Sequence, residues 1–505
     1  MGLKSVLTSA SAAVLVSVLG SAEAGASLPP ENHTDGLISE WLFDEGAGNT
    51  VADSVGSNDV DLTATSAQSF TWQSWGAQFT GGAFVTPLMG TVKTIAALIR
   101  VPNQSSGGFI VAGGTAANQG IVQGFGYTSG TAHVGGGFGV HPLKQRSPSA
   151  SNECYEPTGG GWLLIFMEPS GTIDTAYALG GRASTSLTSN RCAELDVVAM
   201  WAWDKSLTDA NKAENYAFAA YVARQRGVYL RSIDCPVQRN AIVLLGDSLA
   251  EGRSLISGLS TGDQNQVFDN VWISVTDNNN VPDFYPPPVF DLGVNQTTSS
   301  PAGQFGHELG MAQAAEAAGT DLVIIKGSLG GSHFAPVDSN GAGDPSVTQT
   351  WYPETTQSTL FARLLGNFYW TEQYFRNQGI GLSITGLHID GGLNDATNVN
   401  YSGASGTVYQ GHYQDLKDEF ETYTNVSGYR VSMTLCHNND PASDATALAR
   451  IRSGQTAFAT ALGASVAQLI NIDSATFPDN VHPGPSDALA TGDTAYEWLV
   501  NGVAA

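Results

Sequence analysis

Apolar and polar positions follow different patterns in the two halves of the chain. From Gly36 to about Gly227, short alternating stretches such as Gly108 to Ala112 and Gly161 to Phe166 lie between glycine-rich turns. This pattern is typical of the half-buried strands of a β-sandwich. Beyond residue 239 the apolar runs are continuous, as in parallel strands buried on both faces. We therefore expect an all-β domain over residues 36–230 and a different domain after it.

The second half alternates predicted strands with predicted helices. The expected strands are Asn240 to Leu245, Asp321 to Lys326, Ser383 to Ile389 and Tyr429 to Leu435, and two expected helices are Glu308 to Ala318 and Ser358 to Gln378. The alternation predicts a three-layer α/β domain with a parallel, flavodoxin-like sheet over residues 240–505. In the first half, Thr208 and Asp209 should begin a helix that Gly227 ends. Residues 231–239 are the expected linker.

Residues 1–24 have the composition of a secretion signal. Lys4 precedes an apolar stretch from Val6 to Leu19, and Ala22-Glu23-Ala24 has the small-x-small form that signal peptidase accepts. The stretch is shorter than the roughly 20 apolar residues of a membrane span, and serines interrupt it. We expect a secreted mature protein without a membrane partner.

The four cysteines lie beyond this signal, at Cys154, Cys192, Cys235 and Cys436. An even number in an exported chain suggests disulfides, and the sequence alone permits three pairings. We favour Cys154 with Cys192 and Cys235 with Cys436, because each pair then stays within one domain. Since no CxxC spacing is present, we expect no zinc site, and nothing in the sequence calls for another metal or a cofactor.

The formal charge is −25, and it is unchanged when Lys4 and Glu23 leave with the signal. Such a surface repels nucleic acid and anionic membranes, and no cluster of Lys and Arg opposes it. We therefore expect neither nucleic acid nor a membrane as a partner. The oligomeric state is left open.

Four short polar blocks follow the predicted strands or lie near the C-terminus. They are Gly246-Asp247-Ser248-Leu249, Gly330-Gly331-Ser332-His333, Gly391-Gly392-Leu393-Asn394-Asp395 and Asp479-Asn480-Val481-His482. Each block alone has an ordinary explanation as a helix cap or a turn. However, the carboxyl ends of parallel strands meet at one edge of a sheet, which is where reactive groups gather in open α/β folds.

Together, and in this order, the four blocks resemble those of the SGNH (GDSL-type) hydrolases over residues 240 to roughly 500. The resemblance implies that Ser248 is the nucleophile, that His482 is its base and that Asp479 orients His482. It also implies an oxyanion hole made by the backbone N–H groups of Ser248 and Gly331 and the side chain of Asn394.

Within that class, Phe305 to Leu309 followed by Ile324 to Ser332 is similar to carbohydrate acetylesterases of the sialate O-acetylesterase and acetylxylan esterase type. Those enzymes carry GQS and QGESD where this chain has Gly246-Asp247-Ser248 and Gly391 to Asp395. The resemblance implies a secreted esterase that removes acetyl or other short acyl groups from a polysaccharide. His333 and His388 lie near these blocks and could line the pocket, although a structural role is the simpler explanation for either histidine. The alternatives are a lipid or aryl esterase, an acyltransferase with the same triad, and a non-catalytic carbohydrate-binding adhesin.

In the first half, Leu37 to Gly48 and Asp196 to Thr208 resemble the opening and closing strands of laminin-G/concanavalin A-like lectin modules. This resemblance covers most of residues 36–230 and implies a jelly-roll sandwich. Trp72 and Trp75 could stack on sugar rings, but packing within the sandwich would explain them equally well.

A competing serine motif lies at Gly258-Leu259-Ser260-Thr261-Gly262, which matches the GxSxG pattern of α/β-hydrolases. That motif requires a sharp turn between a strand and a helix, and no apolar strand precedes it here. We therefore expect Ser260 to be a loop serine. His307-Glu308 lacks the second histidine of a metalloprotease motif.

Overall fold

The computed structural model describes residues 32, 34–62, 69–81, 84–100, 108–113, 120–123, 132–134, 138–140, 153–154, 162–169, 177–179, 194–230, 232–275, 289–293, 303–330, 332–334, 351, 359–397, 406–424, 426–437 and 444–504. The predicted signal at residues 1–24 lies outside these ranges. None of the helices in these ranges combines the length and the apolar character that a membrane span needs.

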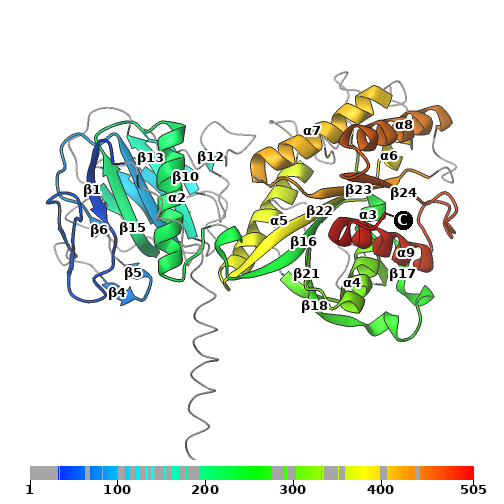
Figure 1. Ribbon diagram of the computed structural model, residues 1–505, viewed down its shortest axis with the longest axis horizontal. Helices are drawn as coiled ribbons and strands as arrows, with labels where there is room; N and C mark the ends of the chain where they lie inside the picture. The colour runs from blue at the N-terminus through cyan, green and yellow to red at the C-terminus, as the bar shows by residue number, and fades with distance from the viewer. Residues whose placement is uncertain are drawn as a thin grey trace, which may run out of the picture.

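Two antiparallel sheets form the N-terminal part (Figure 1). The first has the order β11 (Phe138–Val140), β13 (Trp162–Pro169), β7 (Thr94–Arg100), β15 (Leu195–Trp203), β5 (Gly76–Gly81) and β4 (Ser69–Gln73), with β1 (Leu37–Trp41) paired to β15. The second has the order β12 (Glu153–Cys154), β10 (Ala132–Val134), β9 (Gly120–Gln123), β8 (Gly108–Gly113), β14 (Tyr177–Leu179) and β6 (Phe84–Val85). A separate pair joins β2 (Thr50–Val51) to β3 (Val60–Asp61). The expected opening and closing strands are therefore direct antiparallel neighbours.

Both faces of the first sheet are covered. Along β7, Ile95, Ala97 and Ile99 pack into a core shared with β6 and β14 of the second sheet. The intervening Ala96 and Leu98 pack on the other side, in a cluster with helix α2 (Asp209–Gln225). This is why the central strands are buried throughout rather than alternating in exposure. Helix α2 begins, as expected, at an N-cap on Thr208.

A third sheet contains seven strands and forms the C-terminal part. Its order is β19 (Val289–Gly293), β18 (Val267–Val275), β21 (Leu322–Ser328), β16 (Val237–Gly246), β22 (Ile380–Asp390), β23 (Arg430–Leu435) and β24 (Ala467–Asn471). Only β19 is antiparallel to its neighbour. The five strands from β21 to β24 follow the doubly wound order 2-1-3-4-5 of flavodoxin-like sheets. The prediction of an α/β domain with a parallel sheet is confirmed.

Helices cover both faces of this sheet (Figure 1). The α-helices are α3 (Ser248–Glu251), α4 (His307–Ala318), α5 (Thr359–Arg376), α6 (Leu393–Thr397), α7 (Gly406–Thr424), α8 (Ala445–Leu462) and α9 (Pro485–Tyr496). Shorter elements are η2 (Ser232–Asp234), η3 (Ile256–Gly258), η4 (Asp263–Asn265), the π-helical turn η6 (Glu497–Asn501), and the paired strands β17 (Ser254–Leu255) and β20 (Gln304–Phe305). On β16, Val243 and Leu245 pack toward α5, α7 and α8, whereas Ile242 and Leu244 pack toward α4 and α9.

Strand β16 begins at Val237 rather than at Asn240. Its first residues pair with the start of β22, but they are polar or exposed and so give no apolar signal. Part of the expected linker is therefore strand.

The predicted disulfide between Cys235 and Cys436 is wrong, because both are free, buried thiols. Cys235 precedes the first residue of β16, whereas Cys436 follows the last residue of β23, and the two strands run parallel through β22. The cysteines therefore lie at opposite ends of the sheet, separated by more than the length of β16, which is about 30 Å at the usual rise per residue. The other predicted pair cannot be followed, since Cys192 lies outside the described residues.

Candidate active site

Ser248 stands directly after the central strand, at the first position of α3. The chain leaves β16 at Gly246, whose φ of 154° and whose contact with β22 both require glycine: a Cβ there would lie 1.6 Å from the Asp390 carbonyl oxygen. Asp247 caps α3 by accepting a hydrogen bond from the Leu249 N–H at 3.0 Å. The tight turn leaves Ser248 half-buried at the carboxyl edge of the sheet.

His482 meets Ser248 from a turn that follows β24. Its Nε2 lies 3.0 Å from Ser248 Oγ, and its Nδ1 lies 2.6 Å from Asp479 Oδ2. The other oxygen of Asp479 accepts the backbone N–H groups of Val481 at 2.9 Å and His482 at 2.7 Å. Asn480 has a left-handed φ of 70°, which turns the chain so that one carboxylate serves three donors. The structure thus brings together the three residues expected to form a triad.

The pKa of Asp479 is below its usual value. Burial acts to raise this pKa, but the hydrogen bonds from the His482 ring and from the two backbone N–H groups outweigh it. Asp479 is therefore ionised at neutral pH and is placed to hold a proton on His482 Nδ1. The remaining ring nitrogen then faces the Ser248 hydroxyl with its lone pair.

Asp247 links the Ser248 turn to the block after β22. Its Oδ2 accepts the Gly392 N–H at 3.2 Å and the Asn394 side-chain amide at 3.3 Å. Burial, supported by the neighbouring carboxylates Asp390 and Asp395, raises the pKa of Asp247 to about 7 despite these donors. Asn394 is half-buried, and its amide carries two N–H groups. The bond from one of these N–H groups to Asp247 fixes the orientation of the Asn394 side chain.

Two contacts hold the His482 turn from either side, and sequence reasoning missed both. The His437 ring, which follows β23, makes a 2.8 Å hydrogen bond through Nε2 to the Val481 carbonyl oxygen. Ser254 Oγ donates to the Pro483 carbonyl oxygen at 2.7 Å. Neither residue belongs to a recognisable motif, so only the fold identifies them.

The other expected site residues have mixed outcomes. Gly331 lies outside the described residues, and the side chain of His333 is half-buried. Trp72 and Trp75 pack against different hydrophobic clusters, so the two rings do not form one platform for a sugar. Ser260 is exposed and bonds to Asp263 Oδ2 at 2.6 Å, as expected of a loop serine.

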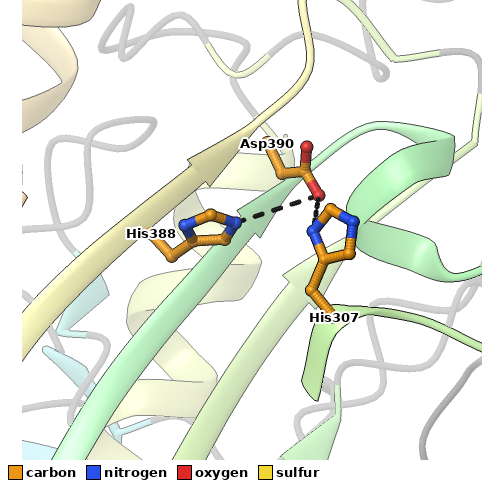
Figure 2. A group of neighbouring side chains, drawn as sticks. All are labelled: His307, His388 and Asp390. Carbon is orange, nitrogen blue, oxygen red and sulfur yellow. Dashed lines mark ion pairs between the residues drawn. The ribbon is translucent and has the colours of Figure 1, made fainter. Parts of the chain in front are cut away.

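Below the Ser248 turn lies a buried polar group that the sequence analysis did not anticipate. His307 is the first residue of α4, and His388 and Asp390 lie two residues apart on the same face of β22. Both imidazole rings are directed at one carboxylate oxygen of Asp390 (Figure 2). Asp390 Oδ2 lies 2.7 Å from His307 Nδ1 and 4.0 Å from His388 Nε2. The H-x-D spacing at the end of a strand was the available signal, since residues i and i+2 share a face.

The ion pair between Asp390 and His307 opposes the effect of burial on both groups. Burial acts to lower the pKa of His307, but the Asp390 carboxylate raises it overall, and His307 lowers the pKa of Asp390 in return. His388 has only a distant carboxylate, so burial lowers its pKa to about 4. At neutral pH His388 is therefore uncharged.

Comparison with known proteins gives structural neighbours only. No family model matches the chain, and no curated protein does. Solved structures that align with part of this chain include a carbohydrate acetylesterase from Xanthomonas citri. The two chains are 16% identical, the alignment covers 52% of this chain and 57% of the other, and the TM-score is 0.36. A carbohydrate acetylesterase from Sinorhizobium meliloti has 13% identity, coverage of 52% and 100%, and a TM-score of 0.31. The aryl esterase of M. smegmatis has 14% identity, coverage of 52% and 100%, and a TM-score of 0.30. Similarity at this level carries no argument about activity, which rests on the chain's own residues.

Proposed function

We propose that this protein is a secreted serine esterase that hydrolyses short-chain acyl esters, acetyl esters in particular, on carbohydrates. The observation that carries the proposal is the continuous line of hydrogen bonds from Ser248 Oγ through His482 to Asp479, with distances of 3.0 and 2.6 Å. A nucleophile, a base and a group that orients the base are the components of acyl transfer by serine enzymes.

The reaction follows from this geometry. Ser248 Oγ attacks the acyl carbonyl carbon while His482 Nε2 takes the hydroxyl proton, and His482 then gives that proton to the departing alcohol oxygen. A water molecule, activated by the same nitrogen, cleaves the acyl-enzyme and releases the acid. Asp479 holds the required tautomer throughout and stabilises the imidazolium.

The oxyanion hole of the proposal consists of the backbone N–H groups of Ser248 and Gly331 and the amide of Asn394. Support for Asn394 comes from its bond to Asp247, because an amide that is already oriented loses little entropy when it binds an oxyanion. Ester hydrolysis needs no metal or cofactor in this scheme. The carbohydrate part of the proposal rests on the sequence resemblance of Phe305 to Leu309 and of Ile324 to Ser332 to carbohydrate acetylesterases.

The test is hydrolysis of 4-nitrophenyl esters of increasing acyl length, run in parallel with acetate release from acetylated polysaccharides. Ser248→Ala removes the nucleophile, and Ser260→Ala is the matched control, because Ser260 is an exposed serine in the competing motif. We expect activity on short acyl groups that is lost in Ser248→Ala and kept in Ser260→Ala. Equal activity in Ser248→Ala, or no ester hydrolysis by the wild type, would reject the esterase; a preference for long acyl chains would reject the acetyl specificity.

A further inference from the structure

The buried group below the catalytic turn has the composition of a metal site. His307, His388 and Asp390 each contribute one ligand atom, and the three atoms lie within 4.8 Å of one another. All three side chains are almost wholly inaccessible to solvent. Imidazole nitrogens together with a carboxylate oxygen are a ligand set that proteins use for divalent zinc and its first-row neighbours.

The hydrogen bonding of His388 is incomplete without a cation. Its Nδ1 lies 2.7 Å from Ser432 Oγ, and its Nε2 points toward Asp390 Oδ2 at 4.0 Å with no hydrogen-bond partner. If Nδ1 carries the proton, an Nε2 lone pair faces a carboxylate in a dry interior. If Nε2 carries it, that N–H is too far from the oxygen for a hydrogen bond. A cation bound to both atoms removes the conflict, since metal-bound histidines usually donate their other N–H to a neighbouring acceptor.

The surrounding charges also favour a cation. The buried carboxyl groups of the α/β part, as far as the structure describes it, are Asp247, Glu251, Glu308, Asp390 and Asp395, and the buried lysine is Lys326. Lys326 is already paired with Glu308 at 3.0 Å, and Glu251 is paired with the more exposed Arg253. Asp390 is paired with His307 at 2.7 Å, and the buried carboxyl group of Asp247 lies close enough to interact electrostatically with those of Asp390 and Asp395. Buried charge of one sign is costly unless it is compensated.

The distances require only a small adjustment. Ligand atoms of a tetrahedral zinc ion are about 3.3 Å apart when each bond is about 2.0 Å. The His307–Asp390 contact of 2.7 Å is shorter and the His388–Asp390 contact of 4.0 Å is longer. Each must change by less than about 1 Å, and both imidazoles already aim at the same oxygen (Figure 2).

We propose that His307 Nδ1, His388 Nε2 and Asp390 Oδ2 bind a divalent transition-metal ion, Zn²⁺ in the first instance, with water at a fourth position. Binding displaces the proton that His307 shares with Asp390. The site is structural: it fastens the start of α4 to the end of β22, where the Asp390 carbonyl oxygen accepts the Asp247 N–H at 3.0 Å next to Ser248.

The test is equilibrium dialysis of the chelator-stripped wild-type protein against Zn²⁺ buffered by a competing chelator, with zinc measured by mass spectrometry. We expect about one zinc per chain, and affinity at least about 100-fold weaker in His388→Asn and in Asp390→Asn. Ser432→Ala, which removes the partner of His388 Nδ1, should weaken binding about 10- to 100-fold. His412→Asn, a half-buried histidine on α7 outside the group, is the matched control and should bind as the wild type does.

Two further measurements keep the test decisive if a variant does not fold. Zinc-edge X-ray absorption of the wild type should show two imidazoles and only nitrogen or oxygen ligands. Zinc binding should persist in His482→Ala, because zinc lost there would be bound at the Ser248–His482 pair instead. The proposal is overturned if the wild type binds no zinc, so that His307 and Asp390 form an ion pair only, if sulfur ligands appear, or if His388→Asn retains the metal. None of these outcomes depends on esterase activity.

Discussion

Replacing Asp479 by asparagine separates the two tasks of its carboxylate. One oxygen accepts two backbone N–H groups, from Val481 and His482, and the other accepts His482 Nδ1. An asparagine has one oxygen, and the two backbone donors should claim it, since turning the amide around would sacrifice two hydrogen bonds to keep one. The amide N–H₂ then faces Nδ1, so His482 must place its proton on Nε2, where it opposes rather than accepts the Ser248 proton.

The size of the effect follows from the exposure of this carboxylate. In a buried serine protease triad the same exchange lowers kcat about 10⁴-fold through the wrong tautomer. Here the Asp479 side chain is 56% exposed, so water screens part of its effect on the imidazolium. We therefore expect Asp479→Asn to lower kcat on 4-nitrophenyl acetate about 10³-fold, with little change in KM or melting temperature.

A matched carboxylate lies in the same segment. Asp487 accepts the backbone N–H of Thr476 at 2.8 Å but does not contact the imidazole. Asp487→Asn should leave kcat within about threefold of the wild type. If the kcat of Asp479→Asn stayed within about tenfold of the wild-type value, the reasoning from the tautomer would be refuted, and His482 would need another orienting group.

Three other changes test the frame around Ser248. Asn394→Ala should lower kcat about 100- to 1000-fold in the same assay without altering the circular dichroism spectrum, and a loss below about tenfold would remove this amide from the oxyanion hole. Gly246→Ala should lower the free energy of unfolding in urea by at least about 3 kcal/mol, because its methyl group would overlap the Asp390 carbonyl oxygen, whereas Gly411→Ala, in open space on α7, should be neutral or stabilising. The pKa of Asp247 is raised from 3.8 to about 7 by burial, so the folded state holds a proton that the unfolded state releases between those values, and stability should fall as pH rises from about 4 to about 7. Asp247→Asn should reduce the loss of stability between pH 4 and pH 7 by up to about 4 kcal/mol. Parallel curves of stability against pH for the two proteins would contradict the assignment of the raised pKa to Asp247.

Local sequence patterns predicted the strands and contacts that depend on residues close together in the sequence. Continuous apolar runs identified β16 and β21, because a parallel strand buried on both faces has no polar side. The stretches at β22 and β23 contain polar residues and were predicted as further strands of the same sheet. The contacts among Ser248, His482 and Asp479 were predictable for a related reason. Asp479 and His482 contact each other within one turn, and the carboxyl edge of a parallel sheet limits where Ser248 can meet them.

Predictions that depended on distance within the fold were wrong or were not made. The pairing of Cys235 with Cys436 assumed that two cysteines in one domain can meet, although parallel strand directions place them at opposite edges of the sheet. The contact of His307 with Asp390 joins a helix start to a strand end across 83 positions of the sequence, and no periodicity reports such a contact. His437 was missed for the same reason.

The position of Asp479 on an exposed turn raises the question of what keeps the His482 ring in place. A surface carboxylate contributes little by itself, because solvent competes for its charge. The turn is instead held by protein groups on both sides of His482: the buried His437 ring bonds to the Val481 carbonyl oxygen, and buried Ser254 bonds to that of Pro483. These contacts fix the carbonyl groups on either side of His482, while the Asp479 side chain remains exposed. The position of the His482 ring is therefore set in part by the packed ends of the strands beneath the turn, and Asp479 adds two backbone hydrogen bonds within the turn and selects the tautomer.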